Sequence, residues 1–229
     1  MKTLVIDVGG TNVKFQATGQ KTFSKIPSGP ALTPKKMVAA VRAATASWKY
    51  DAVSIGYPGP VVDGRPTLEP HNLAPGWVGF DFGKAFGRPT KVINDAAMQA
   101  LGSYQGGRML FLGLGTGLGT TLIIDGIVAP MELAHLPYKN GRTYENYVGL
   151  AGLKRFGRKK WRHHVANLVD QLGKALQADS VVLGGGNARL LKKLPPGARL
   201  GNNTHAFIGG FRLWEMPARK PAPAHRQRR

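Results

Sequence analysis

The sequence contains no cysteine, which excludes disulfides and metal sites with cysteine ligands. This composition is typical of a reducing compartment. Acidic residues are also scarce: 12 Asp and Glu stand against 32 Lys and Arg, so the formal net charge is +20. The excess predicts negatively charged partners, namely polyanions, phosphates or anionic surfaces.

The sequence also lacks long apolar runs. The N-terminal residues 2–6 meet a carboxylate at Asp7, so no secretory signal segment fits there. Nowhere does the chain reach the roughly 18 consecutive apolar residues that a membrane-spanning helix needs. We therefore expect a cytoplasmic protein with no membrane partner.

The sequence does contain the pattern of a folded α/β protein. Its 229 residues, 42% of them hydrophobic, suffice for one sizeable domain or two small lobes. Short runs of β-branched residues predict strands, and apolar residues spaced by three or four predict helices. Strands are predicted at residues 4–8, 13–17, 109–114, 120–125 and 180–183, and helices at residues 34–48, 95–104 and 158–176.

The predicted elements divide into two lobes. We expect a small α/β lobe over residues 1–106 and a larger α/β lobe over residues 107–216. Each opens with a strand, a glycine turn and a strand, as in a diverged duplication. Residues 217–229 are basic and lack periodicity, so a disordered tail is expected there.

Two glycine turns are candidate phosphate sites. The first, residues 7–14 (DVGGTNVK), places a carboxylate at a strand end and a lysine after two glycines, and the second is residues 112–120 (LGLGTGLGT). Glycines let backbone N–H groups approach an anion, and a carboxylate holds a metal ion or its water. Neither turn has the spacing of a Walker A loop or a dinucleotide fingerprint. Taken alone, the first turn is equally well an ordinary hairpin.

Four of the 12 acidic residues, namely Asp7, Asp95, Glu132 and Glu145, lie in the candidate functional motifs. Asp95 follows Asn94 where a strand gives way to a helix, a position that suits a helix cap or a general base. Glu132, His135 and Glu145 suit sugar hydroxyls, which both donate and accept, although neutral hydrogen bonding explains them too. No zinc site is expected, because the other usual ligands are missing.

Basic residues crowd one segment, from Lys154 to Arg162, and His163 and His164 follow it. The segment fits a solvated helix face or a strip that binds polyphosphate or nucleic acid. Base stacking is poorly supported, because Trp161 is almost alone as an aromatic residue there.

Taken together, the motifs resemble those of the ROK family (repressor, ORF, kinase) of the actin-like ATPase superfamily, most closely its polyphosphate glucokinase branch. The matching stretches, in family order over residues 4–210, are DVGGTNVKF, VINDAAMQALG, GLGTGLGTTLIIDG, ELAH, YENYVG and VVLGGG. The resemblance implies a two-lobed actin-like ATPase (ribonuclease H-like) α/β fold with a central cleft. It also implies a magnesium-dependent transferase that phosphorylates the 6-hydroxyl of glucose from polyphosphate, ATP or both.

The same resemblance assigns roles to residues. Asp95 is the implied general base, and Mg²⁺ is expected near Asp7, through water. The implied sugar-binding residues are Asn72, Asn94, Asp95, Glu132, His135 and Glu145. The implied donor-binding residues are Asp7, Gly9, Gly10, Thr11, Lys14, Gly115, Thr116, Gly117, Gly184 and Gly185. Lys159, Lys160 and Arg162 form a possible polyphosphate track, and a homodimer is compatible with the family.

Several alternatives stay open. The family's zinc site cannot exist here, and Ala134 replaces a glycine of the family pattern between Glu132 and His135, which bears on sugar fit. The chain is shorter than most members, which bears on ATP as donor. A kinase for mannose, fructose or an N-acetylhexosamine is one alternative. A non-enzymatic ROK homologue that binds a polyanion is another, although a nucleic-acid partner is not expected because no helix-turn-helix precedes the first strand.

Overall fold

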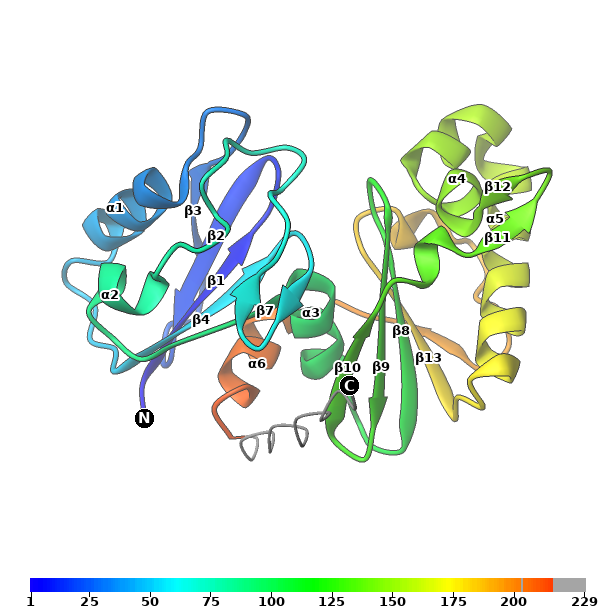
Figure 1. Cartoon of the computed structure of the whole chain (residues 1–229). Helices are drawn as coiled ribbons and strands as arrows, with labels where there is room; N and C mark the ends of the chain where they lie inside the picture. Colours follow the sequence, from blue (N-terminus) through cyan, green and yellow to red (C-terminus); the bar gives the residue numbers. More distant parts are fainter. Residues whose placement is uncertain (203, 216–229) are drawn as a thin grey trace, which may run out of the picture.

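The computed structural model describes residues 1–202 and 204–215. The predicted tail at residues 217–229 lies outside this part of the chain. The described residues form two five-stranded sheets with helices on and between them (Figure 1).

The first sheet has the strand order β3-β2-β1-β4-β7. Its strands are β1 (Thr3–Val8), β2 (Asn12–Ala17), β3 (Ser24–Pro27), β4 (Ala52–Tyr57) and β7 (Thr90–Asn94). β1 and β2 pair antiparallel, as do β2 and β3, whereas β4 lies parallel to both β1 and β7. The sheet is thus a meander of three strands extended by two parallel ones.

The second sheet repeats this topology, in the order β10-β9-β8-β13-β14. Its strands are β8 (Arg108–Leu114), β9 (Leu118–Ile124), β10 (Ile127–Met131), β13 (Ser180–Gly184) and β14 (Ala198–Leu200). β8, β9 and β10 form the antiparallel meander, and β13 lies parallel to β8 and to β14. The repeated topology agrees with the duplication that the two glycine turns suggested.

Short hairpins and helices complete the fold. The hairpins pair β5 (Val61–Val62) with β6 (Arg65–Pro66) and β11 (Pro137–Lys139) with β12 (Arg142–Thr143). The helices are α1 (Pro34–Ala44), α2 (Phe82–Phe86), α3 (Asp95–Ser103), α4 (Tyr144–Val148), α5 (Leu150–Ala175) and α6 (His205–Arg212), with 3-10 turns η1 (Leu133–His135) and η2 (Ala188–Leu190). In the described part of the chain, no helix is long and apolar enough to cross a membrane.

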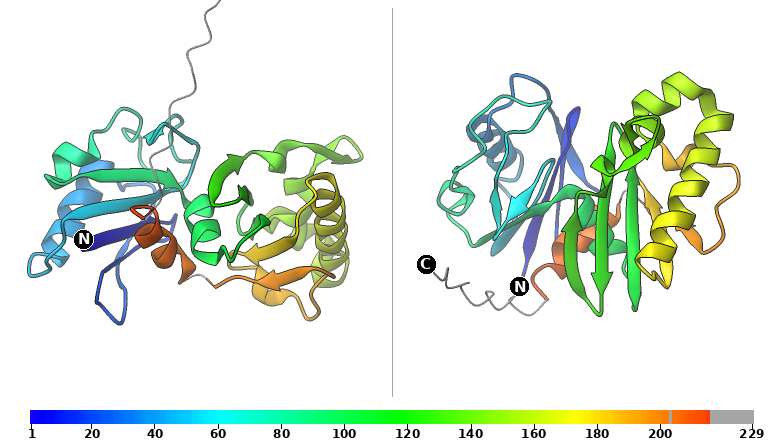
Figure 2. Two further views of the ribbon diagram at one scale, coloured as in Figure 1. Left: turned by 90° about the horizontal axis from the view of Figure 1, so that it is seen from below. Right: turned by 45° about the vertical axis from the view of Figure 1, so that its right-hand side comes forward.

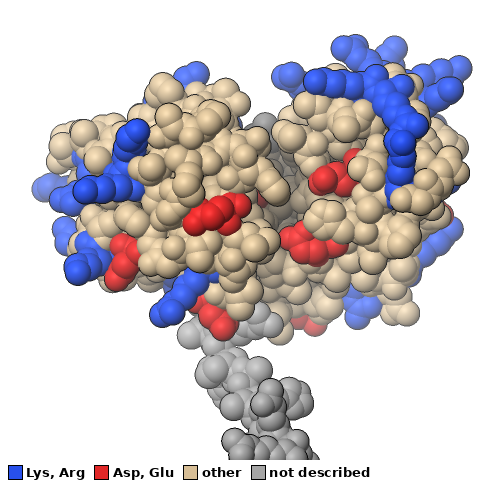
Figure 3. Space-filling model, turned by 45° about the horizontal axis from the view of Figure 1, so that its top comes forward, with Lys and Arg blue, Asp and Glu red and all other residues tan. Residues whose placement is uncertain are grey.

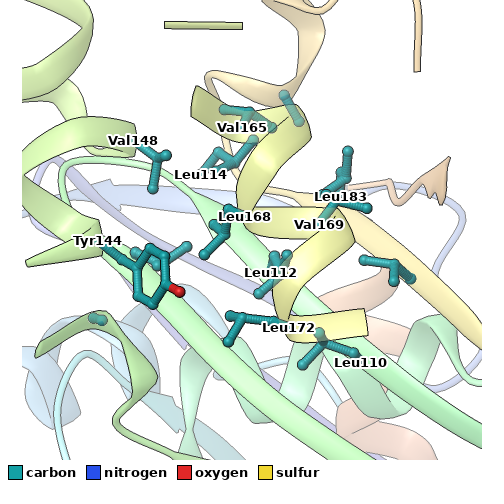
Figure 4. Packing of buried hydrophobic residues seen from close by; sticks show 14 of the residues in the cluster. Leu110, Leu112, Leu114, Tyr144, Val148, Val165, Leu168, Val169, Leu172 and Leu183 are labelled. Carbon is teal, nitrogen blue, oxygen red and sulfur yellow. The ribbon is translucent and has the colours of Figure 1, made fainter. Parts of the chain in front are cut away.

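Helix α5 covers the second sheet with the apolar stripe that its sequence predicts. Trp161, Val165, Leu168 and Leu172 are buried. Figure 4 shows the last three of them facing Leu110, Leu112 and Leu114 of β8. The helix begins before the predicted start at residue 158, but Gly157 interrupts it with a φ of 68°, a conformation that glycine adopts without steric cost.

Helices α3 and α6 pack between the two sheets (Figures 1 and 2). Helix α3 follows β7 of the first sheet and contacts β9 of the second, whereas α6 follows β14 and contacts β1 of the first sheet. The two helices also pack on each other, and Gly102 and Gly209 leave no room for side chains at their contact. The predicted boundary after residue 106 falls between α3 and β8, and it remains a prediction.

Candidate active site

The first glycine turn connects β1 to β2 and places two charged residues side by side. Asp7 and Lys14 face each other in the strand register. The N–H of Gly9 donates to the carbonyl of Asn12 (3.1 Å), and a side chain at Gly9 would press against that same oxygen. The turn is therefore a tight hairpin that also carries a carboxylate at its base.

Asp95 is the first residue of α3, but the cap of this helix is Asn94. The Oδ1 of Asn94 accepts the N–H of Ala97 (3.0 Å), and its Nδ2 donates to the carbonyl of Gly59 (3.1 Å). Oδ1 of Asp95 accepts the N–H of Ala96 (2.7 Å). The helix-cap role that the sequence left open for Asp95 is thus filled by its neighbour.

Electrostatics set Asp95 apart from an ordinary surface carboxylate. Desolvation by the surrounding protein, followed by the nearby charge of Asp7, raises the pKa of Asp95 to about 7. Desolvation also raises the pKa of Asp7, and Lys14 partly offsets this. Both residues are half-buried. A carboxyl group with a pKa near neutrality suits proton transfer at cellular pH.

The second glycine turn is braced from several sides. The N–H of Leu150 donates to the carbonyl of Thr116 (3.1 Å), and Nδ2 of Asn187 donates to the carbonyl of Gly115 (2.9 Å). Gly185 has a φ of 79° and lies so close to the backbone of Leu114 that no side chain fits. Sequence reasoning missed Asn187, although its position directly after three glycines was a usable signal.

The long segment between β4 and β7 is folded around a carboxylate. Oε2 of Glu69 accepts the N–H groups of Gly76 and Trp77 (both 3.0 Å), and its Oε1 accepts that of Val78 (3.2 Å). Glu69 thereby closes the loop whose tip carries Asn72. No sequence motif pointed to this role of Glu69.

A cavity of about 320 Å³ lies between the two glycine turns. Its wall on the first lobe includes Gly10, His71 and Asn72, and its wall on the second lobe is Thr116, Gly117 and Glu145. Of the predicted sugar and donor residues, the structure thus brings five to this cavity and adds His71. Asp7, Asn94 and Asp95 are not among its lining residues. A second hollow, of about 400 Å³ around Arg108 and Asp179, contains none of the predicted residues.

Glu145 and Asn72 each lie against one of the glycine turns. Oε2 of Glu145 accepts the N–H of Leu118 (3.0 Å), and a side chain at Gly117 would overlap the Glu145 carboxylate. A side chain at Gly10 would touch Asn72. The two glycines therefore leave the space that these polar side chains occupy.

Glu132 and His135 lie outside the residues that line this cavity. Their side chains are 64% and 69% exposed, and Oε2 of Glu132 is 3.8 Å from Nδ1 of His135. The hydroxyl of Thr120 fixes this segment, because it donates to the carbonyl of Met131 (2.5 Å) and accepts the N–H of Leu133 (3.2 Å).

The basic run lies on the first half of α5. Lys159 and Lys160 are exposed, whereas Arg162 donates from Nε to the carbonyl of Leu190 (2.8 Å). Within residues 1–202 and 204–215, no member of the run forms an ion pair. Figure 3 shows Lys and Arg gathered on the outer side of the lobe that carries α4 and α5, and acidic groups on both sides of the central hollow. The run leaves several positive charges unneutralised.

Comparison with known proteins identifies the family. The sequence model described as the ROK family matches residues 3–130, more than half of the chain. The chain belongs to the ROK family. It is 25% identical to the polyphosphate glucokinase of Mycobacterium tuberculosis (strain CDC 1551 / Oshkosh) over 215 residues, which cover 83% of this chain and 80% of that one.

Solved structures confirm the predicted two-lobed actin-like fold of this ROK protein. The inorganic polyphosphate/ATP-glucomannokinase from Arthrobacter sp. strain KM superposes with a TM-score of 0.76 at 23% identity, covering 91% of this chain and 96% of that one. A ROK family glucokinase from Streptomyces griseus, solved with glucose and AMPPNP, gives 0.73 at 17% identity, covering 93% and 99%. A ROK transcriptional regulator, a homologue of the Escherichia coli MLC protein, gives 0.71 at 16% identity, covering 91% and 76%.

Proposed function

We propose that this ROK protein is a hexose kinase that transfers a phosphoryl group to the 6-hydroxyl of glucose. The observation that carries the proposal is Asp95, whose pKa is raised to about 7 by desolvation and by Asp7. The cavity between two glycine turns, and the sugar kinases among the similar proteins, support the same conclusion.

The reaction assigns one step to each group. Oδ2 of Asp95 accepts the proton of the 6-hydroxyl while the sugar oxygen attacks the terminal phosphorus of the donor. The new O–P bond forms as the bond between that phosphorus and the donor's bridging oxygen breaks, and the shortened donor leaves with its charge. Backbone N–H groups of the two glycine turns stabilise the transferred group, and Asn72 and Glu145 hold the sugar ring. The exposed side chains of Glu132 and His135, which do not line the cavity, stay predicted sugar ligands.

Asp7 offers Mg²⁺ one carboxylate, and no group of three or more potential protein ligands occurs within residues 1–202 and 204–215. One carboxylate suits Mg²⁺, which keeps several waters and takes its other ligands from substrate phosphates. A carboxylate oxygen is the kind of ligand that Mg²⁺ prefers, and a nearby cation offsets the desolvation that raises the pKa of Asp7. When bound, the ion neutralises negative charge on the donor phosphates. Asp7 would hold it through water, with Lys14 beside it.

The donor is polyphosphate, ATP or both. The unneutralised charge of Lys159 and Lys160 favours a chain of phosphates, which a row of cations binds along its length. The segment with Gly184 and Gly185 lies against the second turn and suits a nucleotide.

A coupled assay for glucose 6-phosphate tests the proposal. Purified protein, glucose and Mg²⁺ are combined in parallel with ATP and with long-chain polyphosphate. Product with either donor supports the proposal, and product with mannose, fructose or an N-acetylhexosamine in place of glucose would redirect it to another sugar. No product with any sugar and either donor would favour a binding protein, as in the ROK regulator.

A further inference from the structure

An aromatic cluster in the second lobe has no role in the chemistry described so far. It consists of Tyr138 of β11, Tyr144 and Tyr147 of α4, and Phe156 and His164 of α5, and is called here the tyrosine–histidine cluster. The ring centroids of Tyr138 lie 4.8 Å from those of Tyr144 and 5.0 Å from those of Tyr147. Tyr147 is in turn 5.0 Å from Phe156 and 4.8 Å from His164. The cluster therefore joins a hairpin and two helices.

Hydrogen bonds orient Tyr138 within the cluster. Nδ2 of Asn167 donates to the phenol oxygen (3.3 Å), which leaves the phenol proton free to donate to Nδ1 of His164 (3.3 Å). This arrangement needs a neutral imidazole. Burial, followed by Lys139 and His163, lowers the pKa of His164 and so favours that neutral form. The two hydrogen bonds and the neutral form of His164 together favour one orientation of the Tyr138 hydroxyl.

The cluster bears on Glu145 because of where Glu145 lies in the chain. Helix α4 has only 5 residues, and two of them, Tyr144 and Tyr147, are members of the cluster. Glu145 follows Tyr144 directly and points its Oε2 at the N–H of Leu118. A helix this short has little stability of its own, so its rotation depends on the side chains that pack against it.

We propose that Tyr138 is a positioning residue that sets, through α4, the direction of the Glu145 carboxylate in the cavity. Tyr138 stacks on Tyr144, meets Tyr147 edge-on and binds His164 of α5, so removing its ring takes away packing that both tyrosines of α4 share. Tyr147 keeps its direct contacts with Phe156 and His164, so the helix stays attached to α5 while its rotation is less restrained. The effect on catalysis rests on the proposed role of Glu145 in holding the sugar.

The test compares Tyr138→Ala and Tyr138→Phe with a matched control. Tyr104→Ala removes the same atoms from the opposite end of the second sheet, where the Tyr104 hydroxyl binds Gly107 and Gly126 (2.9 and 3.0 Å). We expect Tyr138→Ala to raise the KM for glucose by about tenfold with a smaller change in kcat, because misplacement of a binding group costs affinity. Tyr138→Phe keeps the ring contacts and should stay within about threefold of the wild type. An unchanged KM in Tyr138→Ala, or an equal rise in Tyr104→Ala, would overturn the proposal.

A second readout separates this inference from the proposed function. Tyr138→Leu is measured alongside and replaces the alanine variant if that variant does not fold. Hydrogen exchange should accelerate at residues 117–119 and 144–148 in the alanine or leucine variant and not in Tyr104→Ala. If the wild-type protein phosphorylates no sugar, the proposed function fails while the exchange result still judges the positioning role. Unchanged exchange at these residues would refute it.

Discussion

The two glycine turns occupy equivalent places in their sheets, but they differ in charge and in the interactions that hold them. The first turn carries Asp7 and Lys14 and has one internal backbone bond, from Gly9 to Asn12. The second turn has no charged residue, but Asn187 and Leu150 hold its carbonyls and Glu145 takes the N–H of Leu118.

This difference indicates a division of labour between the lobes. In the proposed reaction the first lobe would supply the charged groups, since the charge of Asp7 helps to raise the pKa of Asp95 at the end of β7. The second lobe would supply a backbone turn that the protein's own hydrogen bonds already hold in place. Donors fixed in advance need no reorganisation as charge develops in the transition state.

The largest expected effect on activity comes from a substitution in the first lobe, which carries the charged groups. Asp95→Asn should lower kcat by about 10²- to 10⁴-fold while glucose still binds, because the amide cannot accept the hydroxyl proton. Steady-state kinetics and calorimetric titration with glucose measure the two properties. Asp81→Asn is the control, because Asp81 caps α2 away from the cavity through Lys84 and asparagine caps as well. Substantial residual turnover in Asp95→Asn would remove Asp95 from the role of base.

The pH profile of the activity tests the proposed role of Asp95 as general base. Its pKa of about 7 means that the carboxyl group is protonated, and inactive, at lower pH. Activity should therefore fall by about tenfold per pH unit below that value. Asp7→Asn removes a neighbouring negative charge, so the acid limb of kcat/KM should move to lower pH even though the rate falls. A limb that stays in place would show that Asp7 does not act on Asp95.

A smaller effect on activity is expected at the second glycine turn, which hydrogen bonds from other segments hold in place. Asn187→Ala leaves the carbonyl of Gly115 without its side-chain donor, a loss of about 1 kcal/mol that loosens the second turn. The KM for the phosphoryl donor should rise severalfold while that for glucose changes little. Asn202→Ala, which removes only a local bond to Thr204, serves as the control in the same kinetic assay. Equal changes in both KM values would mean that the turn does not serve the donor.

The smallest effect concerns the basic run. Neutralising Lys159, Lys160 and Arg162 as glutamines should raise the KM for long polyphosphate more than that for ATP, and reduce its salt dependence. Lys35→Gln with Lys36→Gln on α1 is a control that also removes charge from a helix, but in the first lobe. Equal effects on both donors would leave the run as a solvated helix face.

The local pattern predicted much of the fold, whereas the role of Asp95 as base came from the family resemblance and stays a prediction. Alternation and helical spacing gave β1, β2, β8, β9, β13 and the buried stripe of α5, because burial on one face leaves a period in the sequence. The family and the two-lobed fold are confirmed. The helix α6 and the strand β10 were not predicted, since their segments are short or lack a clear period.

The sequence by itself determined the two glycine hairpins, the positions of Asp7 and Asp95 at the ends of their strands, and the excess of positive charge. The first two depend on neighbours in the chain, and the third depends on composition alone. Only the tertiary structure decided that α3 and α6 cross between the sheets, that Glu145 lies against Gly117, and that Asn187 holds the second turn. These contacts join residues 27 to more than 100 positions apart. The reason is physical: periodicity records which face of an element is buried, but not which distant element covers it.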